Sequence, residues 1–160
     1  MLGKRVNESY TTMTEVVFPN DANNHGTLFG GRLLNWIDNI GGIVAKRHSR
    51  KTVVTASIDS LNFLHPIQQR FIVTLNAWIN FVGTTSMEVE VRVTSENPDT
   101  GEISKNCRAF ITYVAIAKDG RPEKVPPLIA ETPEEIARMK TAKKRRAERL
   151  KNLKLKAVEW

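Results

Sequence analysis

Apolar and polar residues alternate with the two-residue period of a β-strand along the centre of the chain, from Phe71 to Phe81 and again from Ser86 to Ser95. Such alternation predicts strands with one face toward a core and the other toward solvent. In the second strand the expected inward residues are Met87, Val89, Val91 and Val93. The expected outward residues are Glu88, Glu90 and Arg92.

Three further segments have the composition of strands. Residues 10–17 and 52–63 are rich in β-branched residues, and residues 107–118 are apolar on nearly both sides, which is typical of a central strand. Residues 82–85 interrupt the alternation, and residues 97–101 have the usual composition of a turn. Since strands follow one another directly after residue 52, we expect an antiparallel sheet.

Residues 30–48 have the period of a helix instead. The apolar residues that share an arc of about 120° are Leu33, Trp36, Ile37, Ile40, Ile43 and Val44. Asp38 lies at the margin of this arc, near Gly42. Gly41 and Gly42 each destabilise a helix interior by about 1 kcal/mol relative to alanine. We therefore expect another backbone or a ligand to approach the helix closely on this side.

A second helix is expected to begin at Thr132, because a capping residue is followed by Pro133 and two acidic residues, and it could run to about Lys156. The wide apolar arc of the first helix must be covered, and the economical cover is a sheet curled around it. Such a sheet has exposed edges, which pairing with a second subunit would protect.

The positive charge of the chain lies almost entirely in its last part. The formal net charge is +7, but residues 138–156 contain ten Lys or Arg and one acid, whereas residues 1–137 contain 14 basic and 15 acidic residues. We therefore divide the chain into a body, residues 1–137, and a basic helical tail, residues 138–160, and expect no specific nucleic-acid binding. The tail could be a solvated helix on the surface of an assembly, could bind an anionic nucleotide, or could be attracted to acidic lipid or nucleic acid.

The length and the remaining composition predict one domain in the cytoplasm. A chain of 160 residues favours a single core, and it has no apolar run that would give stable membrane insertion. The N-terminal residues lack the features of a signal peptide. The single cysteine, Cys107, cannot form an internal disulfide and is expected to be a buried thiol.

The loop before the first helix and the helix itself carry a two-part motif. Residues 21–31 read Asp-Ala-Asn-x-x-Gly-x-x-x-Gly-Gly, and residues 38–42 read Asp-x-x-Gly-Gly. This motif resembles that of the hotdog-fold acyl-CoA thioesterases, and more narrowly the bacterial acyl-CoA hydrolases related to the brain-type cytosolic enzyme. The resemblance covers roughly residues 10–135.

The resemblance implies an α+β hotdog fold, with an antiparallel sheet of about five strands wrapped around one long helix and a C-terminal helix in addition. It implies hydrolysis of an acyl-CoA, a reaction of fatty acid metabolism, with no metal and no cofactor other than the coenzyme A of the substrate. Members of the family form homodimers by joining sheets edge to edge, and many assemble further into hexamers that are trimers of dimers.

The motif also suggests catalytic residues. Asp38 would be a general base or a nucleophile, and the sequence leaves both open. Asn23 would hold a water or the thioester oxygen, and in this family it meets the aspartate across the dimer interface. Gly31, together with Gly30, would offer backbone amides to the oxyanion at the positive end of a helix. Thr55 lies where related enzymes place a hydroxyl near the aspartate. The simpler interpretations are a surface aspartate, a turn asparagine, an ordinary start of a helix and a β-branched strand residue.

Coenzyme A carries phosphates, so its site needs cations and N–H donors. The resemblance places Gly83, Thr84 and Ser86 in a loop that borders the pantetheine and nucleotide, although many relatives have arginine where this chain has Thr84. Arg108 and Arg70 are further candidates for phosphate contacts.

The three histidines, His25, His48 and His65, have no spacing typical of metal ligands, and no nucleophile-elbow motif is present. His48 is expected near the negative end of the helix dipole. Two rival functions stay open at this stage. One is a non-catalytic acyl-CoA-binding regulator, although only about nine residues precede the first strand. The other is a hotdog hydratase or dehydratase, which would use a histidine with an acid.

Overall fold

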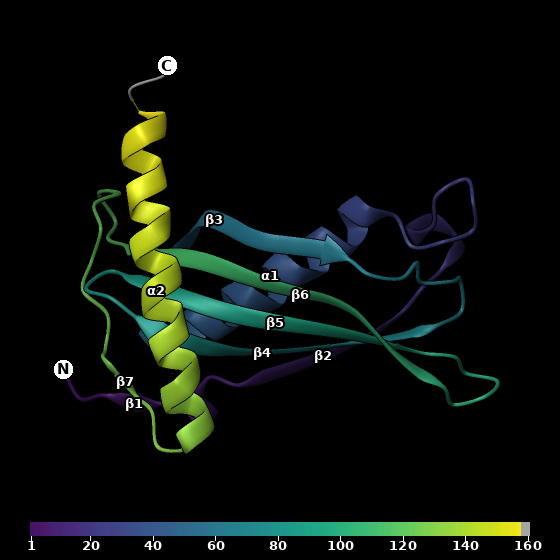
Figure 1. Ribbon diagram of the computed structural model, residues 1–160, viewed down its shortest axis with the longest axis horizontal. Coiled ribbons are helices and arrows are strands. Elements are labelled where there is room, and N and C mark those ends of the chain that lie inside the picture. Colours follow the sequence, from purple (N-terminus) through teal and green to yellow (C-terminus); the bar gives the residue numbers. More distant parts are fainter. Residues whose placement is uncertain (158–160) are drawn as a thin grey trace.

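The computed structural model describes residues 1–157, and its main part is a five-stranded antiparallel sheet curved around one long helix (Figure 1). The helix is α1, Gly30–Ser49, and the order across the sheet is β2-β4-β5-β6-β3. The strands are β2 (Thr11–Val16), β3 (Thr52–Phe63), β4 (Ile72–Val82), β5 (Ser86–Glu96) and β6 (Ile103–Ile116). The prediction of an α+β hotdog fold is therefore confirmed.

Small elements complete the body at its ends. Strand β1, Lys4–Arg5, pairs in parallel with β7, Leu128–Ile129. Two short 3-10 helices, η1 (Val6–Glu8) and η2 (Pro19–Asp21), flank β2. In the part of the chain that the structure describes, no helix is both long and apolar enough to cross a membrane.

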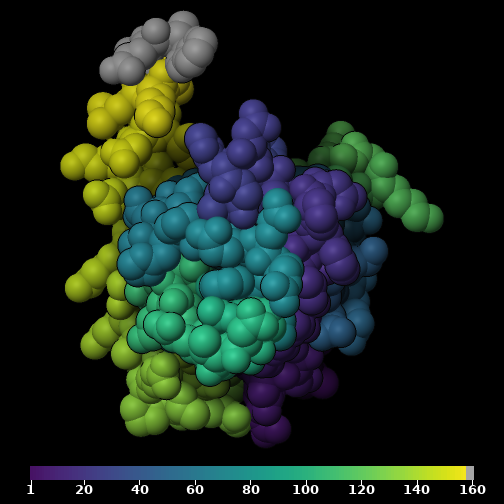
Figure 2. Space-filling view, turned by 90° about the vertical axis from the view of Figure 1, so that its right-hand side faces the viewer, coloured from purple at the N-terminus to yellow at the C-terminus, as the bar shows by residue number. Residues whose placement is uncertain are grey.

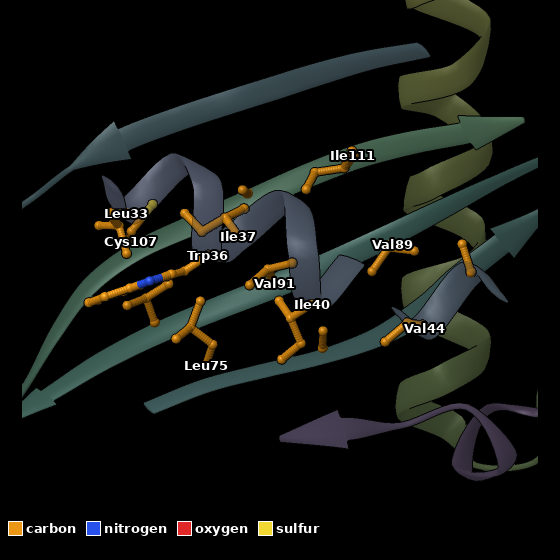
Figure 3. Close-up of a cluster of buried hydrophobic side chains, with 14 of the residues drawn as sticks. Leu33, Trp36, Ile37, Ile40, Val44, Leu75, Val89, Val91, Cys107 and Ile111 are labelled. Atoms are coloured by element: carbon orange, nitrogen blue, oxygen red, sulfur yellow. The ribbon is translucent and has the colours of Figure 1, made fainter. Parts of the chain in front are cut away.

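The core lies between α1 and the inner face of the sheet (Figure 3). Five of the six residues predicted for the apolar arc of α1 are buried there, and the expected inward residues of β5 are buried opposite them. Ile43 is the exception, with 41% of its surface exposed, because it lies at the edge of the arc. Cys107 is buried as expected, and burial raises the pKa of its thiol to about 11.

One end of the outer face of the sheet is covered by α2, Pro133–Lys156 (Figure 1). Its N-terminus has the predicted cap, since the Thr132 side chain accepts a hydrogen bond from the Glu135 backbone N–H. In Figure 1 the helix runs across the strands at one end of the sheet, and Figure 2 shows it along one side of the body. The division that we drew at residues 137 and 138 falls inside this helix.

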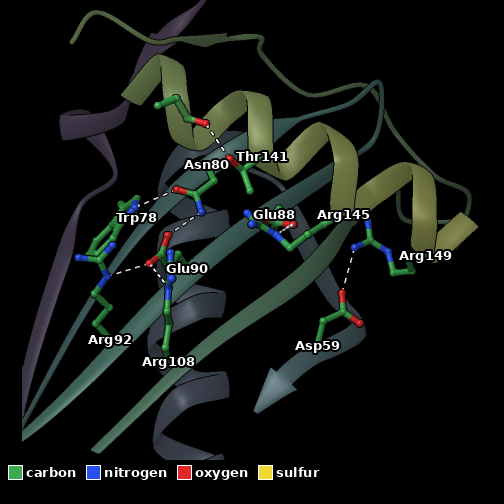
Figure 4. Close-up of polar contacts among 11 residues, drawn as sticks. Asp59, Trp78, Asn80, Glu88, Glu90, Arg92, Arg108, Thr141, Arg145 and Arg149 are labelled. Atoms are coloured by element: carbon green, nitrogen blue, oxygen red, sulfur yellow. Dashed lines mark hydrogen bonds and ion pairs between the residues drawn. The ribbon is translucent and has the colours of Figure 1, made fainter. Parts of the chain in front are cut away.

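This cover corrects one prediction about β5. Glu88 and Glu90 do point away from the core, but they are 3% and 0% exposed rather than solvated. Arg145 of α2 pairs with Glu88 at 2.6 Å, and Arg149 pairs with Asp59 of β3 at 3.0 Å (Figure 4). Alternation within a strand identifies its two faces but does not reveal that a distant helix buries the polar one.

The start of β6 and the alternation within β4 differ from the predictions. Strand β6 begins at Ile103, four residues before Cys107, because residues 103–105 continue the pairing with β5 beyond a bulge at Val93 and Thr94. The alternation of β4 breaks at a second irregularity between Ile79 and Phe81. A change of register alters which side chains face the core, so simple alternation fails at these points.

Candidate active site

Two hydroxyl groups meet at the carboxylate of Asp38. The Thr55 hydroxyl donates a hydrogen bond to Asp38 Oδ1 at 2.8 Å. The Tyr113 hydroxyl lies 3.0 Å from the same oxygen and 2.9 Å from the Asp38 backbone oxygen. Thr55 of β3 and Tyr113 of β6 are directly opposite each other in the sheet register. One cross-strand pair thus brings both hydroxyls to the same turn of α1.

The glycine at position 41 makes room for this arrangement. A β-carbon there would collide with the Tyr113 hydroxyl and would lie 3.0 Å from two carbons of its ring. A β-carbon on Gly42 would meet nothing closer than 3.9 Å. The predicted close approach to α1 therefore occurs at Gly41, but the group that approaches is an aromatic side chain of the same chain and not the expected backbone or ligand.

Tyr113 did not emerge from the sequence as a site residue. Its side chain is buried, and burial, followed by the charge of Asp38 and the hydrogen bond to it, raises the pKa of the phenol above its usual value. It is therefore a protonated donor at any physiological pH. The glycine pair was the signal for a close neighbour, but it did not identify which one.

Asn23 lies in the loop before α1, and its side chain organises that loop. Asn23 Oδ1 accepts hydrogen bonds from the backbone N–H groups of His25 and Thr27, at 2.9 and 3.2 Å. The loop is fixed to residues 67–69 by backbone hydrogen bonds, and Figure 2 shows the two segments adjacent at one end of the molecule. Within a single chain the Asn23 side chain makes no hydrogen bond to Asp38.

Gly30 and Gly31 form the first turn of α1, as expected. The preceding residue, Phe29, gives no side-chain cap to the helix. Its exposed ring lies over Gly31, where a β-carbon would be 2.6 Å from it. Gly31 borders a surface pocket of about 320 Å³ together with Arg32. The side chain at the cap position therefore accepts no hydrogen bond from the backbone N–H groups at the start of the helix.

The β4–β5 turn, with Gly83, Thr84 and Ser86, lies at the end of the sheet next to α2. Gly83 donates its N–H to the Ser86 backbone oxygen at 2.8 Å. Two guanidinium nitrogens of Arg146 lie 3.7 Å from where a β-carbon of Gly83 would be. Among residues 1–157, Arg146 has no carboxylate within ion-pair distance. Ser86 and Arg146 both line a cavity of about 700 Å³ between α2 and β3.

Arg108 lies on the outer face of the sheet, away from Asp38. Its Nε donates to Glu90 Oε1 at 2.8 Å, and the guanidinium of Arg92 makes the same contact (Figure 4). Asn80 donates to the other carboxylate oxygen of Glu90. Burial by itself raises the pKa of the Glu90 carboxyl, but these three donors outweigh it and leave the pKa lowered.

The remaining cation and the histidines lie apart from Asp38. Arg70 is 3.6 Å from Asp99, at the other end of β4 from Gly83. His48 is fully buried rather than charged at the helix end: its Nε2 is 2.8 Å from the Pro126 oxygen, and burial lowers its pKa. Within residues 1–157, no group of three His, Cys, Asp or Glu side chains is arranged to hold a metal ion.

Comparison with known proteins identifies the family. Residues 25–102 match the thioesterase superfamily. The uncharacterized acyl-CoA thioester hydrolase YkhA of Bacillus subtilis is 48% identical over 142 residues, which is 89% of this chain and 83% of that protein. The cytosolic acyl coenzyme A thioester hydrolase of Homo sapiens is 36% identical over 143 residues, or 88% of this chain, which spans 37% of that longer protein.

Solved structures agree. A hexameric acyl-CoA thioesterase superposes with a TM-score of 0.91 at 38% identity, covering 96% of this chain and 98% of that one. An acyl-CoA hydrolase from Staphylococcus aureus, in complex with butyryl coenzyme A, coenzyme A and coenzyme A disulfide, gives 0.87 at 35% identity, with 98% and 94% covered. Other structures of the staphylococcal enzyme carry alanine in place of an aspartate, an asparagine or a threonine. This chain therefore belongs to the acyl-CoA thioester hydrolases of the thioesterase superfamily.

Proposed function

We propose that the protein hydrolyses an acyl-CoA to a free carboxylic acid and coenzyme A, with Asp38 as the group that activates the attack. The observation that carries this proposal is the set of contacts of the Asp38 carboxylate. Its Oδ1 accepts a hydrogen bond from the Thr55 hydroxyl and lies 3.0 Å from the Tyr113 hydroxyl. Among the described residues nothing donates to Oδ2. A carboxylate with one oxygen fixed and the other free has the geometry of a base or a nucleophile.

The residue pattern of the staphylococcal enzyme supports this assignment. The asparagine, aspartate and threonine replaced in its variants are separated by 15 and 17 positions. Asn23, Asp38 and Thr55 have the same residue types at the same separations. Chance would rarely reproduce three types and two spacings together, so the match favours the same roles in this chain.

In the proposed reaction, Oδ2 of Asp38 takes a proton from water while the water oxygen bonds to the thioester carbonyl carbon. The backbone N–H of Gly31 stabilises the oxyanion, a contribution of typically about 10²–10³ in rate. Collapse of the tetrahedral intermediate breaks the carbon–sulfur bond, and the thiolate recovers the proton. The step balances with no metal or cofactor. A single turnover in ¹⁸O-water would label only the acid product in this reaction. Label in Asp38 would instead show that Asp38 formed an anhydride that water opened at the aspartyl carbon.

Each site is proposed to contain residues of two protomers. Strand β3 is a long edge strand of the sheet, and its side chains Val54 and Ile58 are 43% and 37% exposed. An unprotected apolar edge favours pairing with a second copy. Pairing of two β3 strands would bring Thr55 and Asp38 to the seam, where Asn23 and Gly31 of the partner would complete the site. The hexameric relative supports further assembly, which we propose to be a trimer of such dimers in the cytoplasm.

Arg146 is proposed to contact a phosphate of coenzyme A at the β4–β5 turn. It has no ion-pair partner among the described residues, it lies against Gly83, and it lines the same cavity as Ser86. Of the roles open to the basic tail, binding of the substrate nucleotide is thus assigned to this arginine. Arg145 and Arg149 are instead paired with carboxylates of the sheet.

The test is thiol release from acyl-CoA substrates of two to sixteen carbons, for the wild-type protein and for Asp38→Asn. We expect turnover with at least one chain length and a loss of about 10³-fold or more in the variant, as for loss of a group essential to acyl transfer. Binding of acyl-CoA without thiol release would favour the non-catalytic regulator instead.

A further inference from the structure

The Tyr113 hydroxyl has a position that packing alone does not require. A phenylalanine would fill the same space between β6 and α1 and would leave no buried hydroxyl to satisfy. The hydroxyl instead reaches Asp38 through both its backbone oxygen and Oδ1, at 2.9 and 3.0 Å. It does so across Gly41, where any other side chain would block the approach.

We propose that Tyr113 is a positioning residue for the reaction, which holds Asp38 Oδ1 together with Thr55 so that Oδ2 faces the thioester. This inference rests on the proposed function, because it assigns a role toward the catalytic carboxylate. Tyr113 does not touch the substrate. It fixes the rotation of the Asp38 side chain from the buried side, while Thr55 fixes it from the exposed side.

The Tyr113 hydroxyl has two possible acceptors, Asp38 Oδ1 and the Asp38 backbone oxygen. A phenol has one proton, so it donates to either Oδ1 or the backbone oxygen at a given moment, or shares the proton between them. When Asp38 is ionised, Oδ1 is the stronger acceptor. When Asp38 carries the proton taken from water, the backbone oxygen remains available. The buried hydroxyl therefore stays hydrogen-bonded in both states of the reaction, without movement of the ring.

The experiment is Tyr113→Phe, compared with Tyr10→Phe. The control removes an exposed hydroxyl that donates to Asn76 at 2.9 Å on the other side of the sheet, and Tyr10 is the other tyrosine of the chain. For Tyr113→Phe we expect kcat to fall about 10- to 100-fold, since a hydrogen bond to a charged group has effects of that size. KM should stay within about 3-fold, as for loss of an interaction that does not bind substrate.

The pH dependence of kcat/KM distinguishes a role of Tyr113 in positioning Asp38 from a role in the stability of the fold alone. The acidic limb of kcat/KM follows protonation of the catalytic carboxylate, so loss of a donor should move that limb to higher pH. The Tyr10→Phe protein should keep the wild-type profile. A wild-type kcat and an unmoved acidic limb in folded Tyr113→Phe would overturn the inference.

Two further measurements keep the result interpretable. If Tyr113→Phe fails to fold, 3-fluorotyrosine can be incorporated in the Tyr10→Phe protein, where position 113 is the only tyrosine. The more acidic phenol is a stronger donor and should move the acidic limb to lower pH, whereas an unmoved limb would overturn the inference. Asp38→Asn is assayed in parallel with the wild type. Absence of thiol release by the wild type contradicts the proposed function, and an active Asp38→Asn protein contradicts the role proposed for Asp38. An inactive Asp38→Asn protein with a wild-type Tyr113→Phe profile contradicts only the role of Tyr113.

Discussion

Gly41 of α1 lies directly under the Tyr113 hydroxyl of β6, at a distance that leaves no room for a β-carbon. A helix interior loses about 1 kcal/mol with glycine in place of alanine. At this position the loss is offset by the contact between a buried hydroxyl and Asp38. The adjacent Gly42 lacks such a neighbour in the same chain, since its closest contact would be 3.9 Å away.

Gly41→Ala is therefore expected to destabilise the protein by about 1–3 kcal/mol, the usual effect of overpacking a core. Gly42→Ala is the matched control and should be neutral or stabilising by up to about 1 kcal/mol, from helix propensity. Urea unfolding at one fixed protein concentration measures both, because assembly adds to apparent stability. Equal effects of the two substitutions would contradict the tight fit at Gly41.

The hydroxyl of Thr55 should matter more than its methyl group. Thr55→Val keeps the shape of the side chain but removes the donor to Asp38 Oδ1, and we expect kcat to fall about 10- to 100-fold. Thr55→Ser keeps the donor and should retain activity within about 3-fold of the wild type, since the hydroxyl contact is preserved. The steady-state kcat of the two variants tests this expectation. A fully active Thr55→Val protein would contradict a role of the Thr55 hydroxyl in catalysis.

Substitution of Arg146 should weaken substrate binding. Arg146→Ala is expected to raise KM for acyl-CoA about 5- to 30-fold with little change in kcat, because a phosphate contact acts equally on ground and transition states. The effect should shrink at high salt, which screens the attraction between the guanidinium and the phosphate. Lys143→Ala, an exposed cation on the same helix, is the control and should leave KM unchanged. Equal KM increases for both would indicate a general charge effect of the tail.

The buried Glu90 network should stabilise the fold in a pH-dependent way. Because the folded-state pKa of Glu90 is lowered, its contribution is present above the unfolded value of 4.5 and is lost as the pH falls through the folded value. We expect Glu90→Gln to lose about 1–3 kcal/mol at pH 7, since it leaves buried donors poorly matched.

The gap between wild type and Glu90→Gln should narrow below about pH 4.5. Glu134→Gln removes an exposed pair with Arg138 and should change stability by only about 0.3–0.5 kcal/mol. Unfolding free energies measured between pH 3.5 and 7.5 test both expectations. A gap that is constant over this range would contradict the lowered pKa.

Sequence periodicity predicted which residues of a helix or strand face the core. The residues of α1 and β5 that face the core repeat with the period of their own element, so they could be identified before the sheet was known. Glu88 could not be placed in this way, because it is buried against Arg145 of α2, a helix that begins more than forty residues later in the chain.

The site was predictable to a similar degree. Asp38 and Thr55, which the motif and the family resemblance suggested, lie in hydrogen-bond contact. Tyr113 was not predictable, because its role depends on the register between β3 and β6 and on the spacing between helix and sheet. Arg108 alternates with the buried Cys107, and that alternation alone indicates the outer face on which it is found.

The most direct test of the account is activity in mixed dimers of Asn23→Ala and Asp38→Ala subunits. Each variant alone should be inactive, because every site then lacks one of the two residues. In a mixed dimer, one site combines the intact Asn23 of one subunit with the intact Asp38 of the other, so co-expressed and co-purified heterodimers should regain about half of the wild-type kcat per dimer. Verified heterodimers that remain as inactive as the parent variants would contradict a catalytic site shared between two subunits.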